Sequence, residues 1–189
     1  MQQVIVQKFG GTSVGSGERI AAVAEIIKKE AEINNVVVVV SAMAGETDRL
    51  IELSKQFGDN QNKREFDALI STGEKVSASL LAMALNSLGL KAKSYSAAQV
   101  SLKTTSNFSK AKILDIDKAK MEEILADGSI PIITGFQGIT ETGEVTTLGR
   151  GGSDTTAVAI AASIKADRCD IYTDVDGIYT TDPRIVPNA

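Results

Sequence analysis

Five consecutive valines, at positions 36–40, constrain the fold of this 189-residue chain more than any other segment. β-Branched side chains favour strands, and an uninterrupted apolar run predicts a strand that is buried on both faces. Strands of this kind occur in parallel sheets, whose two faces are covered by helices. The valine run therefore predicts a central strand in an α/β fold.

The rest of the chain alternates between strand-like and helix-like patterns, which indicates a doubly wound sheet. The length is typical of one domain. Strands are predicted at 4–6, 36–40, 91–95, 112–114, 130–134 and 168–173. Helices are predicted at 18–32, 47–57, 63–88 (with a kink near Gly73), 117–127 and 153–166. Residues 140–146 are expected to form an irregular excursion or a small hairpin.

The first predicted strand leads into a glycine-rich turn, Lys8-Phe-Gly-Gly-Thr-Ser-Val-Gly15. Gly10 and Gly11 allow close backbone approach, and the N-terminus of the following helix is a favourable place for an anion. Lys8 adds a mobile positive charge, and Ser13 adds a hydroxyl group. In the common P-loop the lysine follows the glycines, whereas here it precedes them. The residues alone leave open a purely structural strand-to-helix turn.

A second glycine-rich turn, Gly149-Arg-Gly-Gly-Ser-Asp154, precedes the predicted helix at 153–166. Ser153 or Asp154 can cap that helix, and the glycines free backbone amides for a ligand. A simple helix cap does not require Arg150, so we expect Arg150 to bind a carboxylate or phosphate group. Asp154 is expected either to orient a lysine or to associate with Mg²⁺.

Three further polar residues are candidate ligand contacts. Ser41 follows the valine run, at the carboxyl end of a strand where ligands bind in open α/β sheets, and Thr47 lies just beyond it. Glu74 follows Gly73, which interrupts a helical pattern at a cost of about 1 kcal/mol relative to alanine and so suggests a backbone or ligand requirement. The structural alternatives are a serine-capped turn for Ser41 and a solvated helix glutamate for Glu74.

The chain contains no histidine, which excludes Ser-His and Cys-His nucleophilic mechanisms and histidine-based zinc sites. The remaining groups suit phosphoryl transfer, which depends mainly on positioning and neutralisation of charge. A net charge of −4 argues against nucleic acid as a partner. The longest apolar run is too short to span a membrane, and the strand-like N-terminus does not resemble a signal peptide, so a cytoplasmic location is expected.

The opening octet resembles that of aspartate kinases, within the amino-acid kinase family. Later segments resemble further motifs of that family in the same order: Ser41-Ala-Met43, Ser71-Thr-Gly-Glu74, Thr147-Leu-Gly-Arg-Gly-Gly-Ser-Asp154 and Tyr172-Thr-Asp-Val-Asp-Gly-Ile-Tyr-Thr-Thr-Asp-Pro-Arg184. This resemblance, which covers nearly the whole chain, implies a three-layer αβα sandwich with a mostly parallel central sheet. It also implies transfer of the γ-phosphoryl group of ATP, with Mg²⁺, to the side-chain carboxylate of L-aspartate. The product is 4-phospho-L-aspartate, at the first step of lysine, threonine and methionine biosynthesis.

The resemblance also implies a role for each candidate residue. Lys8 would bind the transferring phosphoryl group, and Asp154 would organise Lys8 and the nucleotide. Arg150 would hold the α-carboxylate of the substrate, and Glu74 would face its α-ammonium group. The implied substrate contacts are Ser41, Thr47, Glu74, Arg150 and Ser153. The implied nucleotide contacts are Lys8, Gly10, Gly11, Ser13, Thr173, Asp174, Tyr179 and Arg184. No residue is assigned as a metal ligand.

In the family that the chain resembles, the kinase domain continues beyond the position of residue 189, and regulatory ACT domains follow. The resemblance therefore implies that residues 1–189 form a catalytic domain that is incomplete at its C-terminus, from an enzyme that is a homo-oligomer at full length. The implied partners are L-aspartate and MgATP, with neither nucleic acid nor membrane. The alternatives are a glutamate 5-kinase or acetylglutamate kinase of the same superfamily, or a catalytically silent nucleotide-binding fragment.

Overall fold

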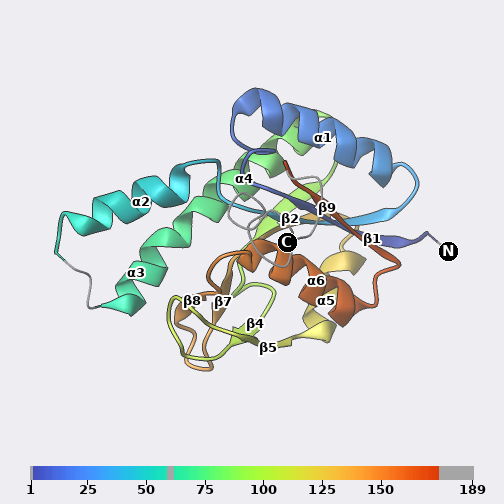
Figure 1. Ribbon diagram of the computed structural model, residues 1–189. Helices are drawn as coiled ribbons and strands as arrows, with labels where there is room; N and C mark the ends of the chain where they lie inside the picture. Colours follow the sequence, from blue (N-terminus) through green and yellow to red (C-terminus); the bar gives the residue numbers. More distant parts are fainter. Residues whose placement is uncertain (1, 59–61, 175–189) are drawn as a thin grey trace, which may run out of the picture.

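The computed structural model describes residues 2–58 and 62–174 of the chain, arranged as a three-layer α/β sandwich (Figure 1). The central sheet contains β1 (Val4–Phe9), β2 (Asn35–Val40), β3 (Ala92–Tyr95), β6 (Ile130–Thr134) and β9 (Arg168–Tyr172). Its strand order is β3-β6-β2-β1-β9, and every neighbouring pair is parallel. The predicted fold class is therefore confirmed.

Helices cover both faces of this sheet (Figure 1). The helices α1 (Gly17–Ala31) and α4 (Thr72–Ser87) pack on one face, where they share a buried apolar cluster with the sheet. The helices α5 (Lys118–Ala126) and α6 (Gly152–Ile164) pack on the other face, over a second cluster. The sheet is thus enclosed between two apolar layers, as a parallel sheet requires.

The valine run forms the middle strand of the sheet, as predicted. Val36, Val38 and Val40 belong to the cluster on the α1–α4 side. Val37 and Val39 belong to the cluster on the α5–α6 side. Successive side chains of a strand point to opposite faces, so an unbroken valine run supplies apolar contacts to both layers at once.

The region predicted as one long helix at 63–88 forms two helices, α3 (Lys63–Ile70) and α4, which are separated at Ser71. Gly73 lies in the first turn of α4, where an added Cβ would sit 2.8 Å from Ala42 Cβ. Gly73 is therefore needed because the helix passes very close to the residue that follows β2. The preceding helix α2 (Glu46–Lys55) agrees with the helix predicted at 47–57.

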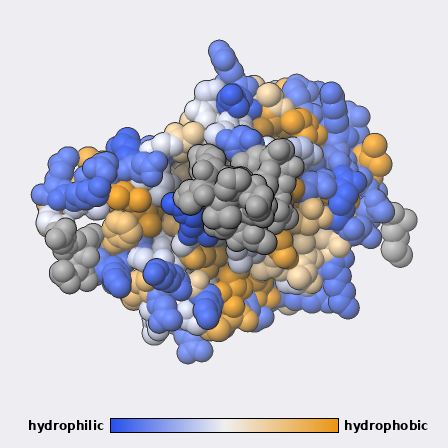
Figure 2. Space-filling model, viewed as in Figure 1, coloured by the Kyte–Doolittle hydropathy of each residue, from blue (hydrophilic) through white to orange (hydrophobic). Residues whose placement is uncertain are grey.

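The segment Lys63–Ser87 has the length and hydropathy of a membrane-spanning helix, but half of its most apolar window is buried inside the protein. That burial is typical of a core helix. On the face shown in Figure 2, hydrophobic residues form patches that hydrophilic residues interrupt.

A second, smaller sheet lies beside the sandwich. It contains β4 (Leu102–Thr104), β5 (Ile113–Ile116), β7 (Gln137–Ile139) and β8 (Val145–Thr147), in the order β5-β4-β7-β8. The antiparallel pair β7–β8 encloses residues 140–144, which agrees with the small hairpin predicted around 140–146. The strands β4 and β7 were not predicted, because three-residue strands carry too little alternation to recognise.

Close packing joins the two middle strands of the small sheet at Gly138. An added Cβ there would overlap Thr104 Cγ2 and lie 3.0 Å from Leu102 Cδ2. Both neighbours are buried, so they have little room to move away. By contrast, a methyl group added at Gly17, in the first turn of α1, would meet no heavy atom within 4 Å.

We expect Gly138→Ala to lower the free energy of unfolding by about 1–3 kcal/mol, because the added methyl group overpacks the contact between β4 and β7. Urea unfolding followed by circular dichroism would measure the change. The matched control is Gly17→Ala, which should leave stability unchanged or raise it by about 0.5 kcal/mol. Equal stabilities for the two variants would contradict this account of the small sheet.

Candidate functional site

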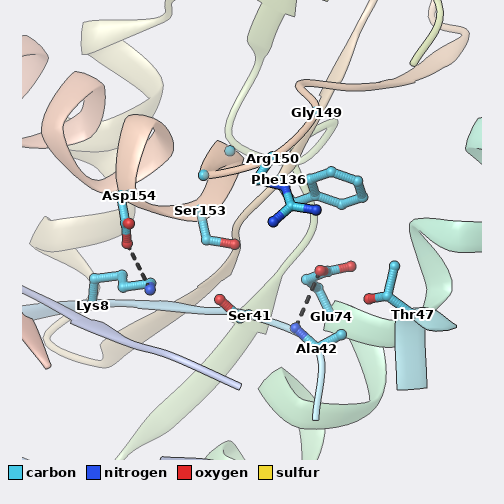
Figure 3. Close-up of a pocket in the computed structure, with 12 residues that line it drawn as sticks. Lys8, Ser41, Ala42, Thr47, Glu74, Phe136, Gly149, Arg150, Ser153 and Asp154 are labelled. Carbon is cyan, nitrogen blue, oxygen red and sulfur yellow. Dashed lines mark hydrogen bonds and ion pairs between the residues drawn. The ribbon is translucent and has the colours of Figure 1, made fainter. Parts of the chain in front are cut away.

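A cavity of about 280 Å³ opens at the carboxyl ends of the central strands (Figure 3). It brings together seven residues that were predicted to bind substrate or to act in catalysis. They are Lys8, Ser41, Thr47, Glu74, Arg150, Ser153 and Asp154. The convergence of side chains from across the sequence at the ends of parallel strands is typical of ligand sites in α/β sheets.

Strand pairing explains why these residues meet. Lys8 lies near the end of β1, and Ser41 directly follows β2, its parallel neighbour. Parallel strands end at the same edge of a sheet, so both residues face the cavity. Thr47, Glu74 and Asp154 lie in the first turns of α2, α4 and α6. The cavity is therefore surrounded by helix N-termini, whose partial positive charge favours anions.

Lys8 and Asp154 form an ion pair, with Lys8 Nζ 2.6 Å from Asp154 Oδ1 (Figure 3). The Lys8 side chain is 8% exposed, whereas that of Asp154 is 47% exposed. Burial of an unpaired ammonium group is costly, and Asp154 supplies the carboxylate partner that Lys8 needs at this depth. The pair fixes the direction of the Lys8 ammonium group at the edge of the cavity.

The first glycine-rich turn packs against backbone. Gly10 N donates a hydrogen bond to Tyr172 O (3.1 Å), at the end of β9. An added Cβ on Gly11 would lie 2.8 Å from Ala42 O. Ser13 N donates to Gly10 O (3.0 Å), and the side chain of Ser16 caps α1. Close backbone approach thus accounts for Gly11, and the predicted nucleotide contacts of both glycines stay predictions.

The other predicted nucleotide contacts lie near or beyond the end of the described chain. Thr173 and Asp174 are exposed and directly follow β9, the strand beside β1. Tyr179 and Arg184 lie outside the described residues. Among the eight predicted nucleotide residues, Lys8 is the one that the structure places in the wall of this cavity.

Glu74 is a buried carboxyl group with one oxygen bonded and one free. Its side chain points into the cavity, and Oε1 accepts a hydrogen bond from Ala42 N (3.1 Å) (Figure 3). Oε2 is buried and has no hydrogen-bond partner within the described residues. Burial raises the pKa of Glu74 to about 7, and the Ala42 hydrogen bond only partly offsets that shift. A bound cation would therefore supply the partner that Glu74 lacks and would stabilise its ionised form.

Arg150 lies between two glycines in left-handed conformations, Gly149 (φ 83°) and Gly151 (φ 74°). This backbone turns the exposed Arg150 toward the cavity, and Figure 3 shows its guanidinium group on the side of Ser153 and Glu74. No carboxylate forms an ion pair with Arg150 in the described part of the chain. The guanidinium group is thus available to an anionic ligand.

The arrangement suits a small ligand that carries both signs of charge. Arg150 offers a fork of donors to a carboxylate, and the buried Glu74 attracts a cation. Lys8 supplies a separate positive charge near the end of β1, beside the turn that contains Gly10. Acidic residues do not form a cluster of three or more that would hold a metal ion within residues 2–58 and 62–174.

The sequence did not single out two residues that line the cavity. Ala42 donates its backbone N–H to Glu74, a role that no side chain reveals. Phe136 lines the cavity with a positive φ of 66°. It follows β6 by two residues, so its position at the carboxyl end of a predicted strand was the available signal.

Comparison with known proteins gives matches over nearly the whole chain. A model of the amino acid kinase family matches residues 3–189. An aspartate kinase of Pseudomonas putida is 58% identical over 187 residues, which cover 98% of this chain and 46% of that relative. The chain therefore spans about half the length of the curated relatives that it matches.

Solved structures agree with this result. The aspartate kinase of Synechocystis is 51% identical, with a TM-score of 0.78, over 97% of this chain and 30% of that chain. Aspartokinase III of E. coli, solved in complex with aspartate and ADP, is 30% identical. Its TM-score is also 0.78, over 97% of this chain and 52% of that chain.

The raised pKa of Glu74 makes stability depend on pH. The folded protein holds the proton of this carboxyl group up to about pH 7, whereas the unfolded chain releases it near the ordinary value of 4.5. This contribution to stability is therefore complete below about pH 4.5 and is lost as the pH rises through 7, by roughly 3 kcal/mol. Glu74→Gln should remove that loss, so the variant should gain stability relative to the parent chain between pH 5 and pH 8 in urea unfolding.

The matched control is Glu46→Gln, a substitution at a nearby glutamate. A hydrogen bond from Arg49 lowers the pKa of Glu46, so its contribution is lost only as the pH falls below about 4.5. This variant should show the same decline between pH 5 and pH 8 as the parent chain. An unchanged decline in Glu74→Gln would mean that Glu74 is already ionised at pH 5.

Proposed function

The chain belongs to the amino acid kinase family, and on that premise we propose that its cavity binds L-aspartate and MgATP for phosphoryl transfer. The reaction moves the γ-phosphoryl group of ATP to the side-chain carboxylate of aspartate. The observation that carries this proposal is the presence of Lys8, Glu74 and Arg150 around one cavity, with charges that match an amino acid next to a polyphosphate. Relatives named aspartate kinase support the choice of acceptor.

The proposed recognition of aspartate uses opposite charges at two points. Arg150, with Ser153 beside it, binds the α-carboxylate through paired hydrogen bonds. Glu74 binds the α-ammonium group through its free Oε2, which removes the cost of an unpartnered buried oxygen. Ser41 and Thr47 add polar contacts on the same side of the cavity. These contacts leave the side-chain carboxylate as the free end of the substrate.

The transfer step needs charge neutralisation more than proton transfer. The acceptor carboxylate has an ordinary pKa near 3.9, so it is ionised at neutral pH and requires no general base. The obstacle is the approach of one anion to a polyanion. Lys8 reduces that repulsion by binding the transferring phosphoryl group, and Asp154 holds the Lys8 ammonium group in position.

Mg²⁺ is proposed to arrive with ATP, because Mg²⁺ is usually held by substrate phosphates and one or two carboxylates. Asp154 is the half-exposed carboxylate at the cavity, which fits that requirement. The metal neutralises charge on the phosphate oxygens when it is bound. The protein residues align the two substrates so that the oxygen of the carboxylate attacks in line with the departing ADP.

We also propose the wider setting that follows from this activity. The product, 4-phospho-L-aspartate, would begin lysine, threonine and methionine biosynthesis in the cytoplasm. Residues 1–189 would act as a catalytic domain, in an enzyme that is a homo-oligomer at full length. Nucleic acid and membranes are not proposed as partners.

Two other functions remain to be separated by experiment from the proposed one. A glutamate 5-kinase or acetylglutamate kinase would use the same type of cavity with a longer acceptor. A catalytically silent fragment would bind ATP without turnover. A single assay of ADP release with several acceptors separates both alternatives from the proposed function.

We expect release of ADP from MgATP in the presence of L-aspartate, with no comparable release for L-glutamate, N-acetyl-L-glutamate or no acceptor. Lys8→Ala should reduce the rate by on the order of 10²-fold or more, because it removes the charge that stabilises the transferring group. A coupled ADP assay measures both. Lys75→Ala is the matched control, since Lys75 is exposed, lies outside this cavity and should not affect the rate.

Each other outcome has a defined meaning. Turnover with another acceptor would overturn the choice of substrate. Binding of MgATP without turnover for any acceptor would favour the silent fragment. Equal rates for Lys8→Ala and the parent chain would contradict the role proposed for Lys8.

A further inference from the structure

Asp67 is a fully buried carboxylate that accepts four hydrogen bonds. It lies in α3, and its Oδ2 accepts from Ser109 N (2.8 Å) and Thr147 N (2.7 Å). Its Oδ1 accepts from the hydroxyl groups of Ser109 (2.9 Å) and Thr147 (3.0 Å). Every donor is neutral, and no lysine or arginine forms an ion pair with Asp67 within the described residues. The carboxylate thus joins three segments that are far apart in the sequence.

These hydrogen bonds hold the base of the loop that carries Arg150. Thr147 is the last residue of β8, three positions before Arg150. Ser109 has a left-handed backbone (φ 66°), and its carbonyl oxygen would lie 3.5 Å from a Cβ on Gly149. Asp67 therefore fixes both the strand from which the Arg150 loop leaves and the backbone against which Gly149 rests.

The same helix end also leads to Glu74. Ser71 N donates to Asp67 O (3.0 Å), and Ser71 O accepts from Gln137 Nε2 (2.8 Å). Glu74 follows in the first turn of α4. The carboxylate thus ties the backbone before Arg150 to α3, and the backbone of α3 continues through Ser71 into the helix that carries Glu74.

Stability alone is a poor explanation for this residue. A buried carboxylate costs a large desolvation energy, and apolar replacements of buried charges are often neutral or stabilising. A second link between α3 and the β7–β8 hairpin already exists, because Arg64 Nε donates to Glu144 Oε2 (2.7 Å). That link is solvent-exposed and weak. Four donors of fixed direction, by contrast, impose one geometry on the loop.

We infer that Asp67 is a positioning residue that holds Arg150 where its guanidinium group meets the α-carboxylate of the amino-acid substrate. This inference rests on the proposed function of the cavity. It predicts that Asp67 contributes to the selectivity for α-amino acids over amines that lack the α-carboxylate. The residue acts through Thr147 and Ser109 and does not touch the ligand.

The test measures ligand binding by calorimetry with the 189-residue chain and three probes: L-aspartate, β-alanine and MgATP. β-Alanine equals aspartate without the α-carboxylate, so it cannot use Arg150. Asp67→Ala should weaken aspartate binding by about tenfold, the loss expected when a hydrogen-bonded charged contact is misplaced. Binding of β-alanine and MgATP should change by less than about twofold. A general loss of folded protein would instead weaken all three ligands together.

Further variants separate geometry from charge. Asp67→Asn keeps an oxygen for the two backbone N–H groups, and its NH₂ group can donate to the two hydroxyl groups, so it should bind aspartate almost as the parent chain does. Thr147→Val removes one of the four hydrogen bonds and should cause an intermediate loss. It also keeps the test valid if Asp67→Ala does not fold. Glu144→Ala, which breaks the exposed link to Arg64, is the control and should have no effect.

A double-mutant cycle tests the route of the effect. If Asp67 acts through Arg150, then Asp67→Ala should cause no further loss of aspartate binding in an Arg150→Ala background. Additive losses would overturn the inference, as would Asp67→Ala or Thr147→Val chains that bind aspartate like the parent. Absence of aspartate binding by the parent chain itself would contradict the proposed function, and with it this inference.

Discussion

The pairing of β1 with β2 is the constraint on which the rest of the structure depends. The two strands are parallel and in register, with Lys8 opposite Val39 and Phe9 opposite Val40. Side chains alternate between the faces of a sheet, so a shift of one residue would move Lys8 to the opposite face and away from Asp154. On β1 itself, Phe9 packs in the cluster on the α1–α4 side and Val6 in the cluster on the α5–α6 side, and Lys8 shares the face of Val6. Core packing thus determines the position of a charged residue at the site.

The electrostatics of the cavity follow from unequal burial of its charged groups. Lys8 is buried but has the half-exposed Asp154 as a partner. Glu74 is buried with no cationic partner in the described chain, and burial therefore raises its pKa to about 7. Arg150 is exposed on a loop, and no carboxylate among the described residues pairs with it. One completed pair and two unmatched groups leave a pattern of charge that a zwitterionic ligand can complete.

The sequence predicted the central sheet and most of the helices because their periodicity is strong, as in the valine run of β2. It singled out seven of the residues that line the cavity, since strand ends and glycine-rich turns mark ligand sites, as at Ser41 and Arg150. Two strands of the small sheet, β4 and β7, escaped prediction because they have three residues each. The four hydrogen bonds of Asp67 could not be predicted either, because they join segments that only the tertiary structure brings together. The nucleotide contacts of Gly10 and Gly11 remain predictions, and backbone packing alone already explains Gly11.

The first strand of the chain is bordered by the last described one, and this arrangement affects how the protein is made. Gln7 and Tyr172 are hydrogen-bonded although 165 residues separate them. A ribosome adds about 5–20 residues each second, so β1 waits on the order of ten seconds for its second neighbour. Contacts of such long sequence separation form late and slow the folding reaction. Lys8 thus leaves the ribosome well before β9, the strand that completes its surroundings. A nascent chain therefore carries this lysine long before Asp154 is present to fix the direction of its ammonium group.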